Sequence, residues 1–392
     1  MKRTDPSDPP ADRPSPPEGY GTSRFAAPLV AALLVALFAA SAVFSRPEPL
    51  RSPLVGELPP PAELVERAAA GAAPAAEARD SAELDRGRLA RGVERLGELG
   101  GVRSLLVMHG GRVVADESYA GSGLNRQPVD VKSASKSVLS ALVGIAIERG
   151  QIDGLDATVE ELLPAYARGL DEAKRAITLG DLLAMESGLG STSGEHYGAW
   201  VTTGDWTAAA LARPLASEPG SEFTYSTGNS HLVSAILSEA TGRTTLELAR
   251  ATLFDPLGVD VAGWQRSPEG YYLGGNSLRI APRDLATFGR LYLERGRWEG
   301  RQLVPAEWIE VSTRRHSEGW PDRYGAYGYL WWLPPDDSWD SFAAIGYGGQ
   351  FLYIVPELDM LAVVTSTLEG KGAEWDREAF AILREDVFGA AE

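Results

Sequence analysis

The sequence predicts an α+β fold of the α/β sandwich kind, in which an antiparallel β-sheet is flanked by helices. Two observations predict it: β-rich runs occur near both ends of the folded part of the chain, and helical patterns fill the stretch between them. We therefore expect a sheet built from both chain ends, with an inserted, mostly helical subdomain at about residues 140–280.

The N-terminal elements are a helix and a hairpin. Apolar residues recur at helical spacing between Glu83 and Leu99, with charged residues between them, and Gly100-Gly101 ends the pattern. Two β-rich runs then surround Gly110-Gly111 within residues 104–119, which is typical of a β-hairpin.

The C-terminal elements are similar. Residues 342–367 contain two β-rich runs separated at 356–359, and a helical pattern follows at about 375–388. Between the two ends, apolar periodicity predicts further helices at residues 136–149, 178–185, 206–212, 231–241 and 283–295.

The first 80 residues divide into three segments. Residues 1–24 are rich in Pro, Ser and charge and predict a disordered cytoplasmic tail, and residues 46–80 predict a Pro/Ala-rich linker to a folded domain at 81–392. Residues 25–45 are apolar and free of charge, so they are long enough for an N-terminal transmembrane helix. Ala40-Ser41-Ala42 also fits a cleavage site, so a removed signal peptide remains open, although the long apolar run favours an anchor. Either alternative puts the folded domain outside the cytoplasm.

Composition excludes several functions. A formal net charge of −17 opposes binding to nucleic acid and to anionic lipid surfaces. We therefore expect no nucleic-acid partner, and contact with a membrane only through residues 25–45. The chain has no cysteine, and its four histidines form no H-x-x-H or H-E-x-x-H pattern. We therefore expect no metal site and no cofactor, while the oligomeric state stays open.

Ser133 and Lys136 form the pattern S-x-x-K at the start of an apolar helical stretch. Residues three apart lie on one face of a helix, so the lysine amine can reach the serine hydroxyl as a base. Lysine is scarce in this chain, which otherwise uses arginine for its cations, and only lysine can supply a neutral amine after burial. Ser133 is the expected nucleophile and Lys136 the expected base.

Two further motifs follow in the chain. Tyr225 lies in a polar loop before a helical pattern, where its hydroxyl can face a cleft. Residues 346–350, Gly-Tyr-Gly-Gly-Gln, lead into a β-run and suit close approach of a substrate. Each motif alone also fits a purely structural role, as a capped helix and a turn.

The order of these three motifs resembles that of the serine β-lactamase and penicillin-binding-protein superfamily. Residues 177–189, 274–293 and 324–332 are most similar to its branch of class C-like β-lactamases, esterases and 6-aminohexanoate-dimer hydrolases. The resemblance covers about residues 85–390 and implies a serine hydrolase that works through an acyl-enzyme.

The resemblance also implies residue roles. Ser133 would be acylated, Lys136 would deprotonate it, and Tyr225 would pass a proton to the leaving group and later activate water. The oxyanion hole would be the N–H groups of Ser133 and Gln350, with Gln350 on a Gly-rich edge strand. The implied substrate-binding residues are Thr227, Asn229, Tyr347, Gly348 and Gly349.

This sequence departs from the family pattern in two places. Thr227 stands where the family often has Asn, and Tyr347-Gly348-Gly349 stands where penicillin-binding enzymes have Lys-Thr-Gly. Without that lysine, a small ester or amide, such as a linear oligoamide of the 6-aminohexanoate kind, fits better than a β-lactam. The aromatic residues able to line an acyl pocket, or equally to fill the core, are Trp200, Trp206, Tyr327, Trp331 and Trp332.

Two alternatives to this hydrolase remain. One is a β-lactamase or D-Ala-D-Ala carboxypeptidase on the same fold. The other, from a different class, is a non-catalytic envelope binding protein, against which the intact Ser133, Lys136 and Tyr225 argue.

Overall fold

The computed structural model describes residues 84–335, 338–368 and 372–392. All of them belong to one compact unit of the chain. The segment predicted to span a membrane, residues 25–45, lies outside the described residues, as do the predicted tail and linker. Among the residues that the structure describes, no helix is long and apolar enough to cross a bilayer.

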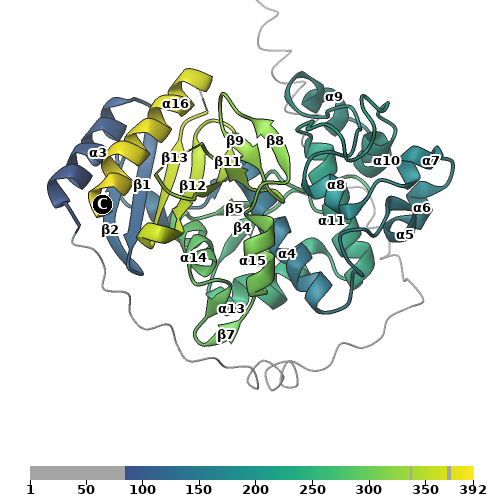
Figure 1. Ribbon diagram of the computed structural model, residues 1–392, viewed down its shortest axis with the longest axis horizontal. Helices are drawn as coiled ribbons and strands as arrows, with labels where there is room; N and C mark the ends of the chain where they lie inside the picture. Colours follow the sequence, from purple (N-terminus) through teal and green to yellow (C-terminus); the bar gives the residue numbers. More distant parts are fainter. Residues whose placement is uncertain (1–83, 336–337, 369–371) are drawn as a thin grey trace, which may run out of the picture. The chain divides into compact units, whose positions relative to one another are not determined.

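An eight-stranded antiparallel sheet, in the order β2-β1-β13-β12-β11-β10-β9-β8, forms the centre of the fold (Figure 1). Strands β1 and β13 pair along their length, from Val102 opposite Ser366 to His109 opposite Met360, so strands from both chain ends lie next to each other in the sheet as predicted. The strands are β1 Val102–His109, β2 Arg112–Ser118, β8 Ser317–Trp320, β9 Gly325–Tyr327, β10 Trp332–Leu333, β11 Phe342–Gly346, β12 Gln350–Val355 and β13 Met360–Ser366.

Helices cover both faces of this sheet. On one face lie α3 (Arg86–Glu98) and α16 (Ala373–Ile382), side by side in Figure 1 although they come from opposite ends of the described chain. On the other lies α14 (Pro282–Leu293). Side chains of β12 alternate between these layers: Phe351 stacks on Phe380 of α16, whereas Leu352 packs at Gly289 of α14. Every residue of β12 is consequently buried.

The segment between β2 and α14 is mostly helical, as the periodicity predicted. A 3-10 turn at Lys132–Ser135 leads into α4, and a small sheet of β3 (Val129–Asp130), β5 (Arg279–Ile280) and β4 (Val261–Gly263) lies nearby in the fold. The helices are α4 Lys136–Glu148, α5 Val159–Leu162, α6 Pro164–Ala167, α7 Glu172–Arg175, α8 Leu179–Leu183, α9 Tyr197–Val201, α10 Trp206–Leu211, α11 Thr227–Thr241, α12 Thr245–Ala249 and α13 Asp255–Leu257. After α14 follow a short β6 (Arg297–Trp298) and β7 (Arg301–Gln302) hairpin and α15 (Ala306–Ser312).

Two details of the C-terminal prediction are wrong. Residues 342–367 form three strands rather than two, because the turn at Tyr347–Gly349 separates β11 from β12. Nor is β12 an edge strand: β10, β9 and β8 extend the sheet beyond β11, so the edges are β2 and β8. The strands that extend the sheet are only two to four residues long, too short to produce clear alternation.

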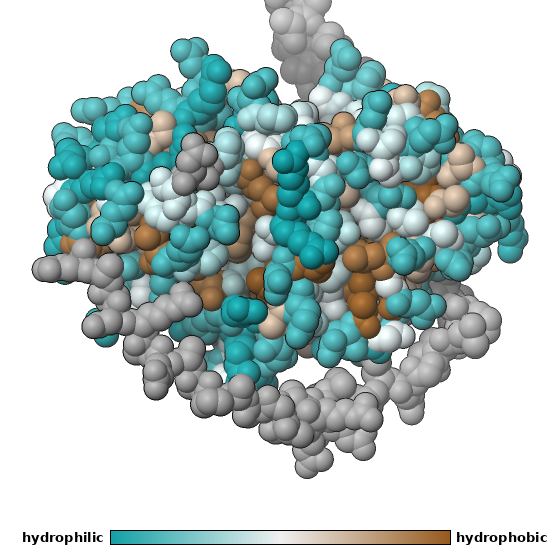
Figure 2. Space-filling view, in the orientation of Figure 1, coloured by the Kyte–Doolittle hydropathy of each residue, from teal (hydrophilic) through white to brown (hydrophobic). Residues whose placement is uncertain are grey.

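The surface seen in Figure 2 is mainly hydrophilic, and apolar side chains occupy only small areas of it. Large exposed hydrophobic side chains are accordingly few among the described residues: Val113, Trp320, Tyr347 and Leu368. Three of these four line one pocket, which is described next.

Candidate active site

A pocket of about 640 Å³ opens where the sheet meets the helical segment. It receives side chains from the turn before α4, from the start of α11, from the turn after β11 and from β8 to β10. Its lining includes Ser133, Tyr225, Thr227, Tyr347 and Gly348, so the fold brings together most of the residues predicted to act on a substrate.

Ser133 lies in the 3-10 turn at Lys132–Ser135, and Lys136 begins α4 directly after it. This local geometry puts the Lys136 Nζ 3.1 Å from the Ser133 Oγ, within hydrogen-bonding distance. Lys132, just before Ser133, has a left-handed φ of 53°, a conformation that is costly for a residue with a Cβ. Asp130 holds that turn by accepting hydrogen bonds from the Lys132 N–H at 2.9 Å and from its Nζ at 2.6 Å.

The environment of the Lys136 amine favours its neutral form. Burial lowers the pKa of Lys136 to about 7. The amine donates to the Gly275 carbonyl at 2.8 Å and lies 3.5 Å from the Thr227 Oγ1. A neutral amine has two N–H donors and one lone pair, so these two acceptors leave the lone pair for the Ser133 hydroxyl. The three contacts together hold the Lys136 amine against the Ser133 hydroxyl, an arrangement that would suit a base.

Tyr225 forms the wall beside this pair. Its ring stacks on Trp332 with centroids 5.6 Å apart, and the Lys136 Nζ lies 5.0 Å from the ring centroid. Burial raises the pKa of Tyr225 to about 12, although a hydrogen bond between its hydroxyl and Ser133 partly opposes that rise. The phenol is therefore protonated at neutral pH and is a proton donor or relay rather than an anion.

The start of α11 is held by a neighbouring loop. The Ser193 Oγ accepts from the Thr227 N–H at 2.8 Å, and the Thr192 Oγ1 accepts from the Gly228 N–H at 2.7 Å. These hydroxyls satisfy donors that a helix N-terminus leaves without partners. Helix α11 thus starts four residues earlier than the predicted helix, and Thr227 enters the pocket from its first turn.

Residues around Gly275 complete the site and were missed from the sequence. A Cβ at Gly275, whose φ is 79°, would lie 2.4 Å from the Lys136 Cγ, so only glycine fits against the lysine. The adjacent Gly274 N–H donates to the Nδ1 of His231 at 3.4 Å, and the His231 Nε2 pairs with Glu269 at 3.1 Å. The fully buried His231 therefore supports the turn whose carbonyl orients Lys136, a role that no sequence motif marks.

Only part of the Gly-rich segment 346–350 lies in the pocket, in contrast to the prediction. A Cβ at Gly346 would lie 2.2 Å from the Val131 carbonyl oxygen, so the end of β11 packs directly against the turn that carries Ser133. Tyr347 and Gly348 line the pocket, but Gly349 and Gln350 do not. The Gln350 side chain is buried and donates to the carbonyls of Gly348 and Ser366. Among the described residues, the N–H groups of Ser133 and Tyr347 donate no hydrogen bond to the protein.

Two other groups of predicted residues, Asn229 and most of the aromatic residues, lie outside the pocket lining. The Asn229 Oδ1 accepts from Ser187 at 3.0 Å, and Asn229 is buried in α11 outside the pocket lining. Of the aromatic residues considered for an acyl pocket, only Trp332 lines it. Trp331 packs in the core against Tyr292 and Phe342, and Trp200 and Trp206 surround His231.

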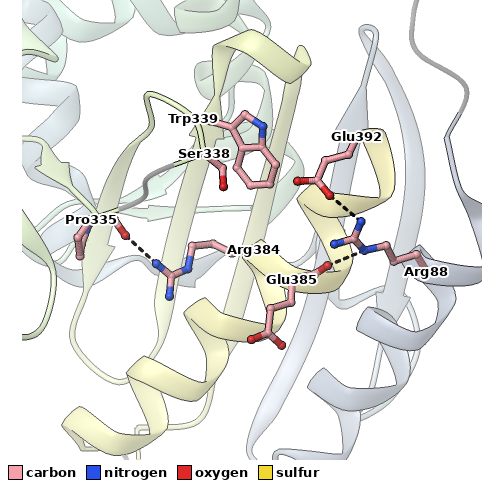
Figure 3. Close-up of a pocket in the computed structure, with 7 residues that line it drawn as sticks. All are labelled: Arg88, Pro335, Ser338, Trp339, Arg384, Glu385 and Glu392. Atoms are coloured by element: carbon pink, nitrogen blue, oxygen red, sulfur yellow. Dashed lines mark hydrogen bonds and ion pairs between the residues drawn. The ribbon is translucent and has the colours of Figure 1, made fainter.

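A second cavity, of about 420 Å³, shares no residue with the Ser133 pocket (Figure 3). Its charged groups are satisfied within the protein: Arg88 pairs with Glu392 at 2.7 Å, and Arg384 donates to the Pro335 carbonyl at 2.6 Å (Figure 3). These contacts tie α3 and the strand region to the C-terminus, so this cavity has a structural explanation.

The chain matches the model of the Beta-lactamase family over residues 89–386, which contain Ser133, Lys136, Tyr225 and Tyr347. This protein belongs to the Beta-lactamase family. The resemblance inferred from the three motifs is thereby confirmed.

Relatives of this Beta-lactamase-family protein agree with that assignment. It is 25% identical over 285 residues to a 6-aminohexanoate-dimer hydrolase of Paenarthrobacter ureafaciens, covering 67% of this chain and 72% of that protein. A putative 6-aminohexanoate-dimer hydrolase from Bacillus anthracis has the same fold, with a TM-score of 0.63, 20% identity and coverage of 76% of this chain and 81% of that one. A penicillin-binding protein homologue from Caulobacter crescentus also shares the fold, with a TM-score of 0.63, 18% identity and coverage of 79% and 99%.

The family and its relatives identify the protein as a serine hydrolase, as the sequence predicted. Family membership leaves the substrate open, because one relative is a 6-aminohexanoate-dimer hydrolase whereas a penicillin-binding protein homologue shares the fold.

Proposed function

We propose that this Beta-lactamase-family protein hydrolyses a small ester or amide through an acyl-Ser133 intermediate. The observation that carries the proposal is the 3.1 Å contact from the Lys136 Nζ to the Ser133 Oγ, with two acceptors on the other side of the amine. That arrangement supports a base ready to remove the serine proton.

In the proposed acylation, the neutral Lys136 accepts the Ser133 proton while Oγ attacks the substrate carbonyl carbon. The proton passes through the Tyr225 hydroxyl to the leaving oxygen or nitrogen, the carbonyl–heteroatom bond breaks, and the alcohol or amine departs. Water then attacks the acyl-serine ester with the same groups as bases, which releases the acid and restores the Ser133 hydroxyl. The pKa of about 12 suits Tyr225 to relay protons without holding a permanent charge.

For the oxyanion hole we propose the N–H groups of Ser133 and Tyr347 in place of the pair with Gln350. Both are unpaired within the described part of the chain, and both residues line the pocket. Gln350 directly follows the turn at Tyr347–Gly349, pairs with Gly346 across the hairpin and does not line the pocket. Backbone donors without a partner in the protein are free to bind the negative charge that develops on the carbonyl oxygen.

A substrate panel tests the proposal. We expect kcat/KM for short p-nitrophenyl esters to exceed that for nitrocefin clearly, because Tyr347 replaces the lysine that would hold a β-lactam carboxylate. The panel also contains D-Ala-D-Ala peptides and the 6-aminohexanoate dimer, the substrate named for the relative from Paenarthrobacter ureafaciens. Faster turnover of nitrocefin or of the D-Ala-D-Ala peptides would favour the two β-lactam-related alternatives, and a folded protein without any turnover would favour the binding protein.

We also propose, on sequence grounds, that residues 25–45 anchor the protein in the cell membrane with the catalytic domain outside. Cell fractionation with N-terminal sequencing checks this. An anchored protein stays in the membrane fraction and keeps residues 25–45, whereas a released protein that begins near Val43 means that a signal peptide has been removed.

A further inference from the structure

Exposed apolar side chains gather at the mouth of the Ser133 pocket. Trp320, Tyr347 and Leu368 are 39%, 68% and 44% exposed, and they are three of the four large hydrophobic side chains that lie exposed in the described residues. They come from the end of β8, the turn after β11 and the segment after β13, so their proximity results from the fold and not from adjacency in sequence. Clustered exposed apolar groups beside a cavity mark a ligand-binding surface.

These three residues, which we call the apolar rim, continue an aromatic wall that starts at the catalytic residues. The Trp320 ring lies 5.2 Å from that of Tyr225 and 5.1 Å from that of Trp332. On the other side, a Cβ at Gly348 would lie 2.7 Å from the Leu368 Cδ2, so the leucine packs over the turn that carries Tyr347. An apolar surface therefore extends outwards from the nucleophile.

Another part of the pocket lining is polar. The Ser193 and Thr227 hydroxyls lie 3.0 Å apart, and the Asn276 Nδ2 donates to the Tyr197 hydroxyl at 2.8 Å. This polar part adjoins Lys136 through Thr227. The pocket thus offers a substrate two surfaces of different polarity.

The charges in the described lining are already neutralised. Lys132 pairs with Asp130 at 2.6 Å, Arg323 pairs with Asp376 at 2.6 Å, and Tyr324 donates to the same Asp376 at 2.5 Å. Lys136, with a pKa of about 7, is largely neutral above that pH. Each of these two cations already has a carboxylate partner, so a substrate carboxylate would have to compete with that partner.

From this arrangement we infer that the apolar rim binds the acyl chain of an uncharged, medium-chain ester or amide. Tyr347 connects the two functions: its N–H is the proposed donor to the carbonyl oxygen, and its side chain belongs to the rim that the acyl carbons would reach next. The inference rests on the proposed function, because it assumes that the acyl group is attached to Ser133. It extends that function by naming the acyl group that the pocket selects.

Full-length protein and p-nitrophenyl esters from acetate to octanoate, each below its micellar concentration, test the inference. We expect kcat/KM to rise about 100-fold over the series, less than the roughly fourfold per methylene that complete burial predicts, because the rim is partly exposed. A p-nitrophenyl monoester of glutaric acid should react at least about tenfold more slowly than the uncharged pentanoate, because its carboxylate finds only paired cations.

Two rim variants and one control locate the effect. Leu368→Ala should lower the octanoate-to-acetate ratio about threefold and Trp320→Ala about tenfold, in proportion to the apolar surface that each removes. Val113→Ala removes the remaining exposed hydrophobic side chain, which lies on β2 outside the pocket, and should leave the ratio unchanged. Both esters react through the same residues, so the octanoate-to-acetate ratio of kcat/KM removes any general effect of Trp320→Ala on Tyr225.

The outcomes separate the inference from the proposed function. Acetate turnover with no dependence on chain length, or a chain-length dependence that both rim variants keep, would overturn the inference alone. Acetate esters of alcohols from ethanol to octanol form a second series. A rate that rises with the length of the alcohol and not of the acid would reassign the rim to the leaving group and so also overturn the inference. Absence of turnover for every ester would contradict the proposed function itself.

Discussion

Ser133→Ala is expected to lower ester turnover by about 10⁴-fold or more, because the acyl-enzyme pathway disappears with the Oγ. The same change should abolish covalent labelling by a fluorophosphonate probe, which phosphonylates Oγ and releases fluoride. No other serine in the described residues has a lysine amine within hydrogen-bonding distance. Intact-protein mass spectrometry measures the labelling, and p-nitrophenyl acetate hydrolysis measures the turnover.

Ser135→Ala is the matched control for this experiment. Ser135 lies in the same 3-10 turn, but its hydroxyl donates to the Lys132 carbonyl at 2.8 Å and does not line the pocket. Its loss removes one hydrogen bond, about 1 kcal/mol of stability, and should leave the probe reactive. Labelling that persists in Ser133→Ala would mean that another residue is the nucleophile.

Lys136→Met is expected to lower kcat/KM for the same ester by about 10²- to 10⁴-fold, the range associated with loss of a general base. In the wild-type protein, kcat/KM should rise with pH through about 7, because the neutral amine forms above the pKa that burial gives Lys136. The rise should be missing from the variant, whose residual activity depends on hydroxide or solvent. A pH profile from 5 to 9 measures both effects.

Lys174→Met provides the matched control for Lys136→Met. Lys174 is also buried, and its Nζ also donates to a backbone carbonyl, that of Leu211, at 2.9 Å. It lines no part of the Ser133 pocket, so its replacement should keep the rise near pH 7. An unchanged pH profile in Lys136→Met would exclude Lys136 as the base.

The stability of Lys136→Met shows whether its loss of activity comes from the missing base or from unfolding. The pKa of Lys136 falls from 10.5 in an unfolded chain to about 7 in the folded protein, so the unfolded chain binds the extra proton between these values. The contribution of this group to the free energy of unfolding of the wild-type protein therefore increases as pH rises from 7 to 10.5. Below pH 7, burial of the lysine carries its full unfavourable free energy. Lys136→Met should thus be at least as stable as the wild type at pH 7, as thermal unfolding can show.

The sequence by itself determined what depends on neighbours along the chain. Ser133 and Lys136 are three residues apart at a helix start, so their contact needs only local geometry, and the β1–β2 hairpin follows from the glycines between its strands. The order of the three motifs also identified the family before any distance was known, because a family keeps its catalytic residues in sequence order.

Only the tertiary structure decided which distant residues meet. The Lys136 amine is oriented by Gly275 and Thr227, which lie 139 and 91 residues away. That Tyr347, and not the predicted Gln350, is the proposed oxyanion donor follows from how the β11–β12 hairpin packs against Val131. The apolar rim likewise joins three segments that are separate in the sequence. Periodicity records which faces of an element are apolar but not which element covers them, so burial, charge pairing and the pocket could come only from the assembled fold.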